Sequence, residues 1–168
     1  ISSLMAAIRL FRAAKRAGAV ATAPIINAGD GKGQHPTQAL LDLYTIHQEL
    51  GRLDGITVAM VGDLANGRTV RSLAYLLGKF SGIRLRLIAP AELAMRDDIK
   101  EYLRRHGLEF LETEDFAKGS QDADVIYLTR IQLERMTDAQ KNAMHARQLY
   151  TVGPEQVGRV EGFAGCVA

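Results

Sequence analysis

The chain has 168 residues, of which 47% are hydrophobic and 24% are charged. This length suits one well-buried core with an additional arm or tail, and it is short for two full domains. The net charge of +2 comes from 21 basic and 19 acidic residues, and no long block of one sign indicates a nucleic-acid partner.

Cysteine content and hydropathy narrow the expected cellular setting. Cys166 is the single cysteine, so the sequence predicts neither a disulfide framework nor a thiolate metal cluster, and a reducing, cytoplasmic location fits best. No apolar run approaches the roughly 20 residues that span a bilayer. We therefore expect no membrane partner.

Residues 1–23 are predicted to form an amphipathic N-terminal helix or arm. Leu4, Ile8 and Phe11 lie at helical spacing, and this apolar stripe can pack on the body of the protein. Residues 1–29 contain four basic residues and no acidic one, which is also typical of an organellar transit peptide. Both interpretations stay open.

A short extended segment at 23–27 and a glycine-rich loop at 28–34 lead into the next predicted helix. Pro36 suits the first turn of that helix, and Gly51 can end it. A helical pattern joins the two positions, through Leu40, Leu41, Leu43, Tyr44 and His47.

Residues 24–153 are predicted to form one α/β domain, with residues 154–168 as a C-terminal tail. From residue 57 onward strand-like and helical runs alternate. Such alternation is typical of a doubly wound, mainly parallel sheet with helices on both faces. We expect strands at 57–62, 83–89, 108–111, 123–129 and 148–152, and helices at 69–80, 97–106, 115–119 and 138–146.

Two predicted strands are followed directly by arginine-bearing segments. Arg68 lies in the segment after the first strand, and Arg130 lies in the segment after the fourth. Ligands of doubly wound sheets bind outside the carboxyl ends of the strands, and a guanidinium group suits a carboxylate bidentately. The pair predicts a site for a dicarboxylate, with surface or salt-bridge roles as the alternative.

His35 is expected at the N-terminus of the helix that begins at Pro36. The positive end of the helix dipole favours the neutral imidazole there. A neutral ring can donate a hydrogen bond to a carbonyl oxygen on which negative charge develops. The alternative is a histidine that only caps the helix or anchors the loop.

Common motifs for nucleotides and metals are missing from the sequence. The glycines at 62 and 67 do not form G-x-G-x-x-G, and there is no Walker loop or paired-histidine zinc motif. We therefore expect no cofactor and no metal.

Three motifs occur in an order and at a spacing that indicate a known family. They are Asn27–Gly31 with His35–Gln38, Gly62–Leu64 with Gly67–Val70, and Thr129–Gln132. From about residue 24 to about residue 152, the chain resembles the C-terminal, aspartate-binding domain of aspartate carbamoyltransferase catalytic chains. The resemblance implies carbamoyl transfer from carbamoyl phosphate to L-aspartate in pyrimidine synthesis.

The resemblance also assigns residues to the carbamoyl group. His35 matches the position that contacts the carbonyl oxygen of this group, and Gln38 matches the position that contacts its amide. These two residues are the catalytic candidates.

Four further residues match the positions that hold aspartate. Arg68 and Thr69 match those that bind its α-carboxylate, and Arg130 and Gln132 match those that bind its side-chain carboxylate. The related ornithine enzymes typically have Ser-Met-Gly where this chain has Arg130-Ile131-Gln132. An additional arginine would repel the cationic end of ornithine, so aspartate is the expected substrate.

Other parts of the family pattern are not recognised in the sequence. We expect no counterpart of the family's N-terminal domain, which carries a Ser-Thr-Arg-Thr phosphate-binding turn and a lysine-bearing loop lent by a neighbouring subunit. The His-Pro-Leu-Pro-Arg stretch of the family is not found either. The chain alone is therefore expected to be inactive, with a non-catalytic binding or assembly module as the alternative. The expected protein partners are further copies, since the family forms trimers, or a separate N-terminal domain.

Overall fold

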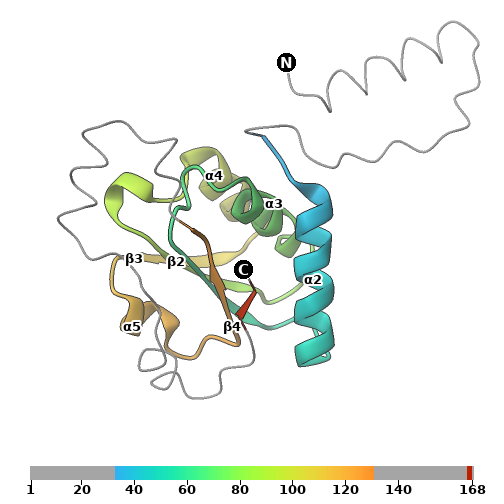
Figure 1. Cartoon of the computed structure of the whole chain (residues 1–168). Helices are drawn as coiled ribbons and strands as arrows, with labels where there is room; N and C mark the ends of the chain where they lie inside the picture. Colours follow the sequence, from blue (N-terminus) through green and yellow to red (C-terminus); the bar gives the residue numbers. More distant parts are fainter. Residues whose placement is uncertain (1–32, 131–165, 168) are drawn as a thin grey trace, which may run out of the picture.

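The computed structural model describes residues 33–130 and 166–167, which form a central parallel sheet with helices on both sides (Figure 1). The strands follow the order β3-β2-β1-β4-β5 across the sheet, and every neighbouring pair is parallel. Their bounds are Thr57–Val61 for β1, Arg84–Ile88 for β2, Glu109–Thr113 for β3, Val125–Leu128 for β4 and Cys166–Val167 for β5. This parallel α/β architecture confirms the predicted fold class.

The described residues contain four α-helices and one short 3-10 helix, of which α2 precedes β1 and the others lie between strands. They are α2 (Pro36–Leu50), α3 (Arg68–Leu77), η1 (Ala91–Leu93), α4 (Asp97–Arg105) and α5 (Phe116–Ser120). Every element expected between residues 36 and 129 is present, with ends that shift by a few residues. The segments expected before residue 33, the helix at 138–146 and the strand at 148–152 lie outside the described residues. Two residues of the predicted tail form β5.

The core lies on both faces of the sheet because β1 is buried on both sides. Val58 and Met60 pack into the cluster formed with α2, α3 and α4. Ala59 and Val61 point to the other face, where Phe116 of α5 packs against the second cluster. A continuous apolar strand is what two covered faces require.

Helix α2 begins and ends as its sequence predicts. Pro36 occupies the first turn, and Gly51 ends the helix in the left-handed conformation with φ 69°, which favours glycine. The buried face differs from the apolar pattern in the sequence, since Leu40, Leu41 and Tyr44 are exposed. The residues that face the core are Ala39, Asp42, Leu43 and Ile46.

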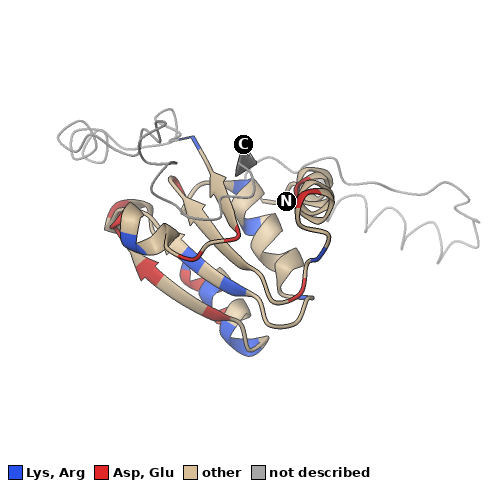
Figure 2. Ribbon diagram, turned by 90° about the horizontal axis from the view of Figure 1, so that it is seen from below, with Lys and Arg blue, Asp and Glu red and all other residues tan. Residues whose placement is uncertain are grey.

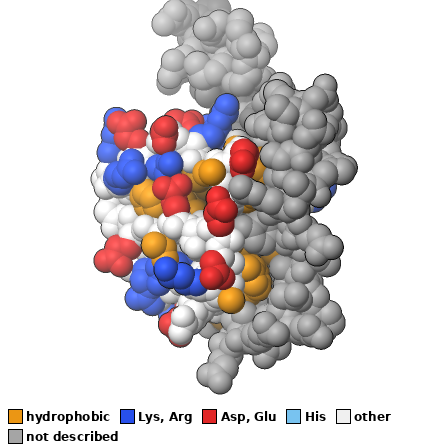
Figure 3. Space-filling model, turned by 90° about the vertical axis from the view of Figure 1, so that its left-hand side faces the viewer, with side chains coloured by type: hydrophobic (Ala, Val, Ile, Leu, Met, Phe, Trp, Pro, Cys, Tyr) orange, Lys and Arg blue, Asp and Glu red, His pale blue; other side chains and the backbone are white. Residues whose placement is uncertain are grey.

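Acidic and basic residues are spread over the described helices and strands (Figure 2). On the side of β3 and α5, basic side chains lie beside acidic ones (Figure 3). Lys100 on α4, for example, contacts Asp97 at 3.1 Å and Glu112 at 3.2 Å. None of the helices described between residues 33 and 130 is long and apolar enough to cross a membrane.

Candidate functional site

The strand order places a switch point between β1 and β4. From β1 the chain continues outward to β2 and then β3, and it returns to the other side of β1 as β4. Connections on the two sides of such a point leave the carboxyl ends of neighbouring strands in different directions, which opens a crevice for ligands. The arginine-bearing segments predicted from the sequence follow these two strands.

The segments after β1 and β4 are in direct contact. Thr129 N–H and its Oγ1 both donate to Val61 O, at 2.9 and 3.1 Å. Gly62 has φ 113°, and a Cβ added to it would lie 2.4 Å from Thr129 O. Only glycine allows both this backbone conformation and this close approach.

Asp63 shapes the loop that leads from β1 to α3. Its side chain is buried, and Oδ1 accepts hydrogen bonds from Asn66 N at 2.9 Å and Asn66 Nδ2 at 3.1 Å. The N–H groups of Leu64 and Ala65 donate to Leu93 O in η1. These contacts fix the backbone immediately before Arg68.

Three of the four predicted aspartate-binding residues lie at or near this edge of the sheet. Arg68 and Thr69 are half-buried at the start of α3, and Arg130 is exposed two residues beyond β4. The structure therefore brings the backbone segments of Arg68 and Arg130 to adjacent strand ends. Gln132 lies outside the described residues, and the roles of these residues stay predictions.

His35 lies at the N-terminus of α2, as predicted, and is tied to α3. Its backbone N–H donates to Ser72 Oγ at 2.8 Å, and the Ser72 hydroxyl donates to Gln34 Oε1 at 2.5 Å. The Thr37 hydroxyl lies 3.3 Å from His35 Nδ1. Through Ser72, the loop before α2 is held against the helix that carries Arg68 and Thr69.

Gln38 is connected to Thr69 through a buried polar chain. Gln38 Nε2 donates to Asp42 Oδ1 at 2.9 Å, and the Tyr127 hydroxyl donates to Asp42 Oδ2 at 3.0 Å. The Thr69 side chain forms a further hydrogen bond with Tyr127. Two residues assigned to different parts of the substrate thus share one network across α2, β4 and α3.

Burial dominates the electrostatics of that network. Asp42 and Tyr127 are 0% and 1% exposed. Loss of hydration raises the pKa of Asp42 above its ordinary value of 3.8, although hydrogen bonds from Gln38 and Tyr127 and the nearby His35 oppose the shift. Burial likewise raises the pKa of the Tyr127 hydroxyl, so this group stays a donor at neutral pH.

Sequence reasoning missed Asp42 and Tyr127. A signal was present for each, because Asp42 shares the helical stripe of Ala39, Leu43 and Ile46, and Tyr127 interrupts an aliphatic strand. A buried polar group needs a partner, but the sequence alone does not indicate that these two residues meet.

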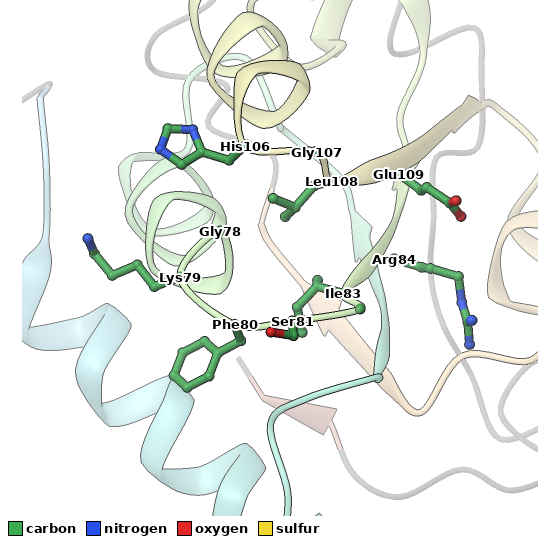
Figure 4. Close-up of a pocket in the computed structure, with 11 residues that line it drawn as sticks. Gly78, Lys79, Phe80, Ser81, Ile83, Arg84, His106, Gly107, Leu108 and Glu109 are labelled. Carbon is green, nitrogen blue, oxygen red and sulfur yellow. The ribbon is translucent and has the colours of Figure 1, made fainter.

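A separate pocket lies at the opposite end of the sheet (Figure 4). The loops before β2 and β3 form it, with Lys79, Phe80, Arg84 and His106 among the lining residues. None of the predicted site residues lines it. Within the part of the chain that the structure describes, no three His, Cys, Asp or Glu side chains are grouped so that they could hold a metal ion.

Family models match most of the chain. The model described as aspartate/ornithine carbamoyltransferase, Asp/Orn binding domain, matches residues 54–160. This chain belongs to the aspartate/ornithine carbamoyltransferase family. A second model of the same family, described as the carbamoyl-P binding domain, matches residues 2–48.

Individual relatives agree with this assignment. The chloroplastic aspartate carbamoyltransferase of Arabidopsis thaliana is 53% identical over 146 residues, which cover 87% of this chain and 37% of that protein. The aspartate transcarbamoylase of Trypanosoma cruzi in complex with carbamoyl phosphate superposes with a TM-score of 0.77 at 40% identity, covering 92% of this chain and 50% of that one.

A third relative is the catalytic subunit of aspartate transcarbamoylase from Methanocaldococcus jannaschii. Its crystal structure has a TM-score of 0.67 and 50% sequence identity, and the match covers 73% of this chain and 40% of that one. The 168-residue chain therefore spans about two fifths to one half of the length of these three relatives.

The match to residues 2–48 corrects one expectation. The sequence alone indicates no counterpart of the family's N-terminal domain, but part of the carbamoyl-phosphate domain is present. His35 and Gln38, the residues assigned to the carbamoyl group, fall inside this matched part. The sequence motifs before residue 48 were too few to indicate that this segment belongs to the carbamoyl-phosphate domain. The predicted boundaries at residues 23 and 153 stay predictions.

Proposed function

We propose that this chain forms the aspartate-binding part of an aspartate carbamoyltransferase site. In the reaction, the amino nitrogen of L-aspartate attacks the carbamoyl carbon of carbamoyl phosphate. A C–N bond forms, the C–O bond to phosphate breaks, and the amine loses a proton, giving N-carbamoyl-L-aspartate and phosphate. Residues of this chain act by positioning the reactants and stabilising the developing charge.

The observation that carries the proposal is the contact between the two arginine-bearing segments. Thr129 bonded to Val61 O holds the segment of Arg130 against the segment that leads to Arg68. Two guanidinium forks at one switch point suit a dicarboxylate. Relatives with 50% identity or more are named aspartate carbamoyltransferases, which favours aspartate over ornithine.

Each site residue has a proposed role. Arg68 and Thr69 bind the α-carboxylate of aspartate, and Arg130 with Gln132 binds its side-chain carboxylate. His35 donates to the carbamoyl oxygen, where negative charge grows during attack. Gln38 contacts the carbamoyl amide.

Calorimetric titration with succinate, a dicarboxylate without an amine, tests the binding half of the proposal. The unchanged chain should bind succinate, and Arg68→Ala and Arg130→Ala should each weaken binding at least tenfold. Arg105→Ala is the matched control, because Arg105 pairs with Glu101 on α4 away from this edge. Equal affinity in all four proteins would refute the dicarboxylate site.

Turnover by the chain alone is a separate question. We predict no enzyme-like rate, because the loss of each donor around a leaving phosphate typically costs 10²–10³ in rate, and no phosphate turn is recognised in the sequence. A colorimetric ureido assay with both substrates tests this, with Arg130→Ala as the blank. Robust product formation would contradict this prediction and show that other residues complete the phosphate site. Activity restored by adding the separately made N-terminal domain of a related enzyme would argue against the binding-module alternative.

Location and assembly also stay predictions. Composition favours the cytoplasm, whereas the relatives from Arabidopsis thaliana and Pisum sativum are chloroplastic by name. The homotrimer that the family implies predicts a sedimentation mass three times 18.4 kDa.

A further inference from the structure

Gln38 can serve a carbamoyl group in only one of its two amide orientations. A carbamoyl NH₂ group donates hydrogen bonds, so its partner must be an acceptor, and the side-chain amide of Gln38 has its acceptor only at Oε1. If the amide were rotated by 180°, Nε2 would face the carbamoyl nitrogen, and donor would meet donor. The orientation therefore has to be fixed before the ligand binds.

Asp42 supplies a reason for one orientation. An ionised carboxylate only accepts hydrogen bonds, so Nε2 of Gln38 must point to Asp42 Oδ1, as it does at 2.9 Å. The second oxygen, Oδ2, accepts from the Tyr127 hydroxyl at 3.0 Å. With a donor on each oxygen, the carboxylate cannot rotate away without losing one of them.

Tyr127 extends the same arrangement to the aspartate side. Its hydroxyl has one proton, which goes to Asp42, so the Thr69 hydroxyl donates to the Tyr127 oxygen. Tyr127 is 1% exposed on β4 and belongs to the core cluster that includes residues of α2 and α3. The carboxylate of Asp42 thus sets the direction of the hydrogen bonds in this network of side chains.

We propose that Asp42, anchored by Tyr127, is a positioning residue that fixes the side-chain amide of Gln38 with Oε1 as the acceptor for the carbamoyl NH₂ group. This inference rests on the proposed function for its ligand. Asp42 touches neither substrate and acts only through Gln38.

The test compares two ligands that differ by the carbamoyl group. N-carbamoyl-L-aspartate and succinate share the dicarboxylate, so the ratio of their dissociation constants isolates the carbamoyl contacts. In the unchanged chain we expect N-carbamoyl-L-aspartate to bind more tightly. Asp42→Asn should remove about tenfold of this preference, the size of one hydrogen bond, while succinate affinity changes little.

A double-mutant comparison separates positioning from a general structural effect. In a Gln38→Ala background, Asp42→Asn should not change the ratio further, because the group that Asp42 positions is gone. If Asp42→Asn acted only by disturbing the fold, the preference for N-carbamoyl-L-aspartate over succinate would fall further in this background. Asp124→Asn is the matched control, since Asp124 bonds Thr57 N at the opposite end of β1 and should leave the ratio unchanged.

Tyr127→Phe is a second variant in case Asp42→Asn does not fold. It removes the donor to Oδ2 without changing the ring, and a smaller loss of the preference is expected. Tyr102→Phe, which removes a hydroxyl bonded to Tyr75 O at 3.1 Å, is its control. A preference retained in both Asp42→Asn and Tyr127→Phe would overturn the inference.

The NMR signals of the Gln38 side-chain amide test the orientation without any ligand. One amide proton should be shifted and protected from exchange in the unchanged chain, and this signature should be lost in Asp42→Asn. If the unchanged chain binds no succinate, the proposed function fails, and the amide spectrum decides the inference alone. Identical Gln38 signals in the two proteins would then overturn it.

Discussion

Asp42 experiences opposing effects on its charge. Its side chain has no solvent exposure, and loss of hydration disfavours the ionised form. Gln38 and Tyr127 each donate to one of its oxygens and favour that form. Burial is the larger effect and raises the pKa of Asp42, so the carboxylate is held in place at a cost in folding free energy near neutral pH.

This balance predicts how stability depends on pH. Because the folded chain binds the Asp42 proton more tightly than the unfolded chain, the contribution of Asp42 to stability is largest below pH 3.8 and decreases as pH rises through its folded-state pKa. The unfolding free energy of the unchanged chain, measured relative to Asp42→Asn, should fall over that interval. Denaturant titrations at several pH values would measure it, and a rise with pH would contradict the assignment.

The planar guanidinium group of Arg130 gives a second prediction. Lysine keeps the charge but lacks the planar fork that binds a carboxylate bidentately. Arg130→Lys should therefore weaken succinate binding by roughly tenfold to a hundredfold, the size of one charge-assisted hydrogen bond, and affect a monocarboxylate less. Calorimetry with succinate and propionate compares the two ligands, and equal losses would contradict the role of Arg130.

The sequence indicated some site residues and not others for physical reasons. His35 and Arg68 adjoin a proline or a glycine that marks a helix start, so their positions follow from local rules. Asp42 and Tyr127 are separated by 85 positions, and no local pattern indicates that they meet. Such long-range polar pairs emerge only when α2 is packed on the sheet.

Gly62 allows the segments after β1 and β4 to approach each other closely. With φ 113° and a Cβ position 2.4 Å from Thr129 O, Gly62→Ala should lower the unfolding free energy by about 3 kcal/mol or more, from backbone strain and overpacking together. Gly51→Ala is the matched control, since Gly51 also has positive φ but open space around it. It should cost only about 1 kcal/mol.

Thermal or denaturant unfolding of both variants would measure this difference. Gly62→Ala should also weaken succinate binding, because the segments after β1 and β4 would separate. Equal destabilisation by the two substitutions would show that the contact between Gly62 and Thr129 is not needed to hold the strand ends together.

The elements differ in how far local sequence determines them. Strand β1 was predictable because a continuous apolar run needs cover on both faces, and α2 because Pro36 and Gly51 mark its ends. The face that α2 buries was not, since Leu40, Leu41 and Tyr44 suggest an apolar stripe yet are exposed. Three residues of η1 are too few to show a periodicity.

The order of the strands in the sheet determines where a ligand can bind. The alternation of strands and helices predicted a parallel sheet but not its order, because several orders satisfy the same alternation. The order β3-β2-β1-β4-β5 places the switch point between the two strands that precede Arg68 and Arg130. The pocket at the other end of the sheet, near Lys79 and His106, is the competing location.

Backbone amide chemical shifts during titration with succinate decide between these locations most directly. The proposed site predicts the largest changes in residues 62–69 and 129–130. Smaller changes are expected at His35, whose backbone N–H donates to Ser72 of α3, and at Gln38, which is linked through Asp42 to Tyr127. Residues 78–84 and 106–109 should be unaffected. Changes confined to that second group, or no changes at saturating succinate, would contradict a dicarboxylate site at the carboxyl ends of β1 and β4.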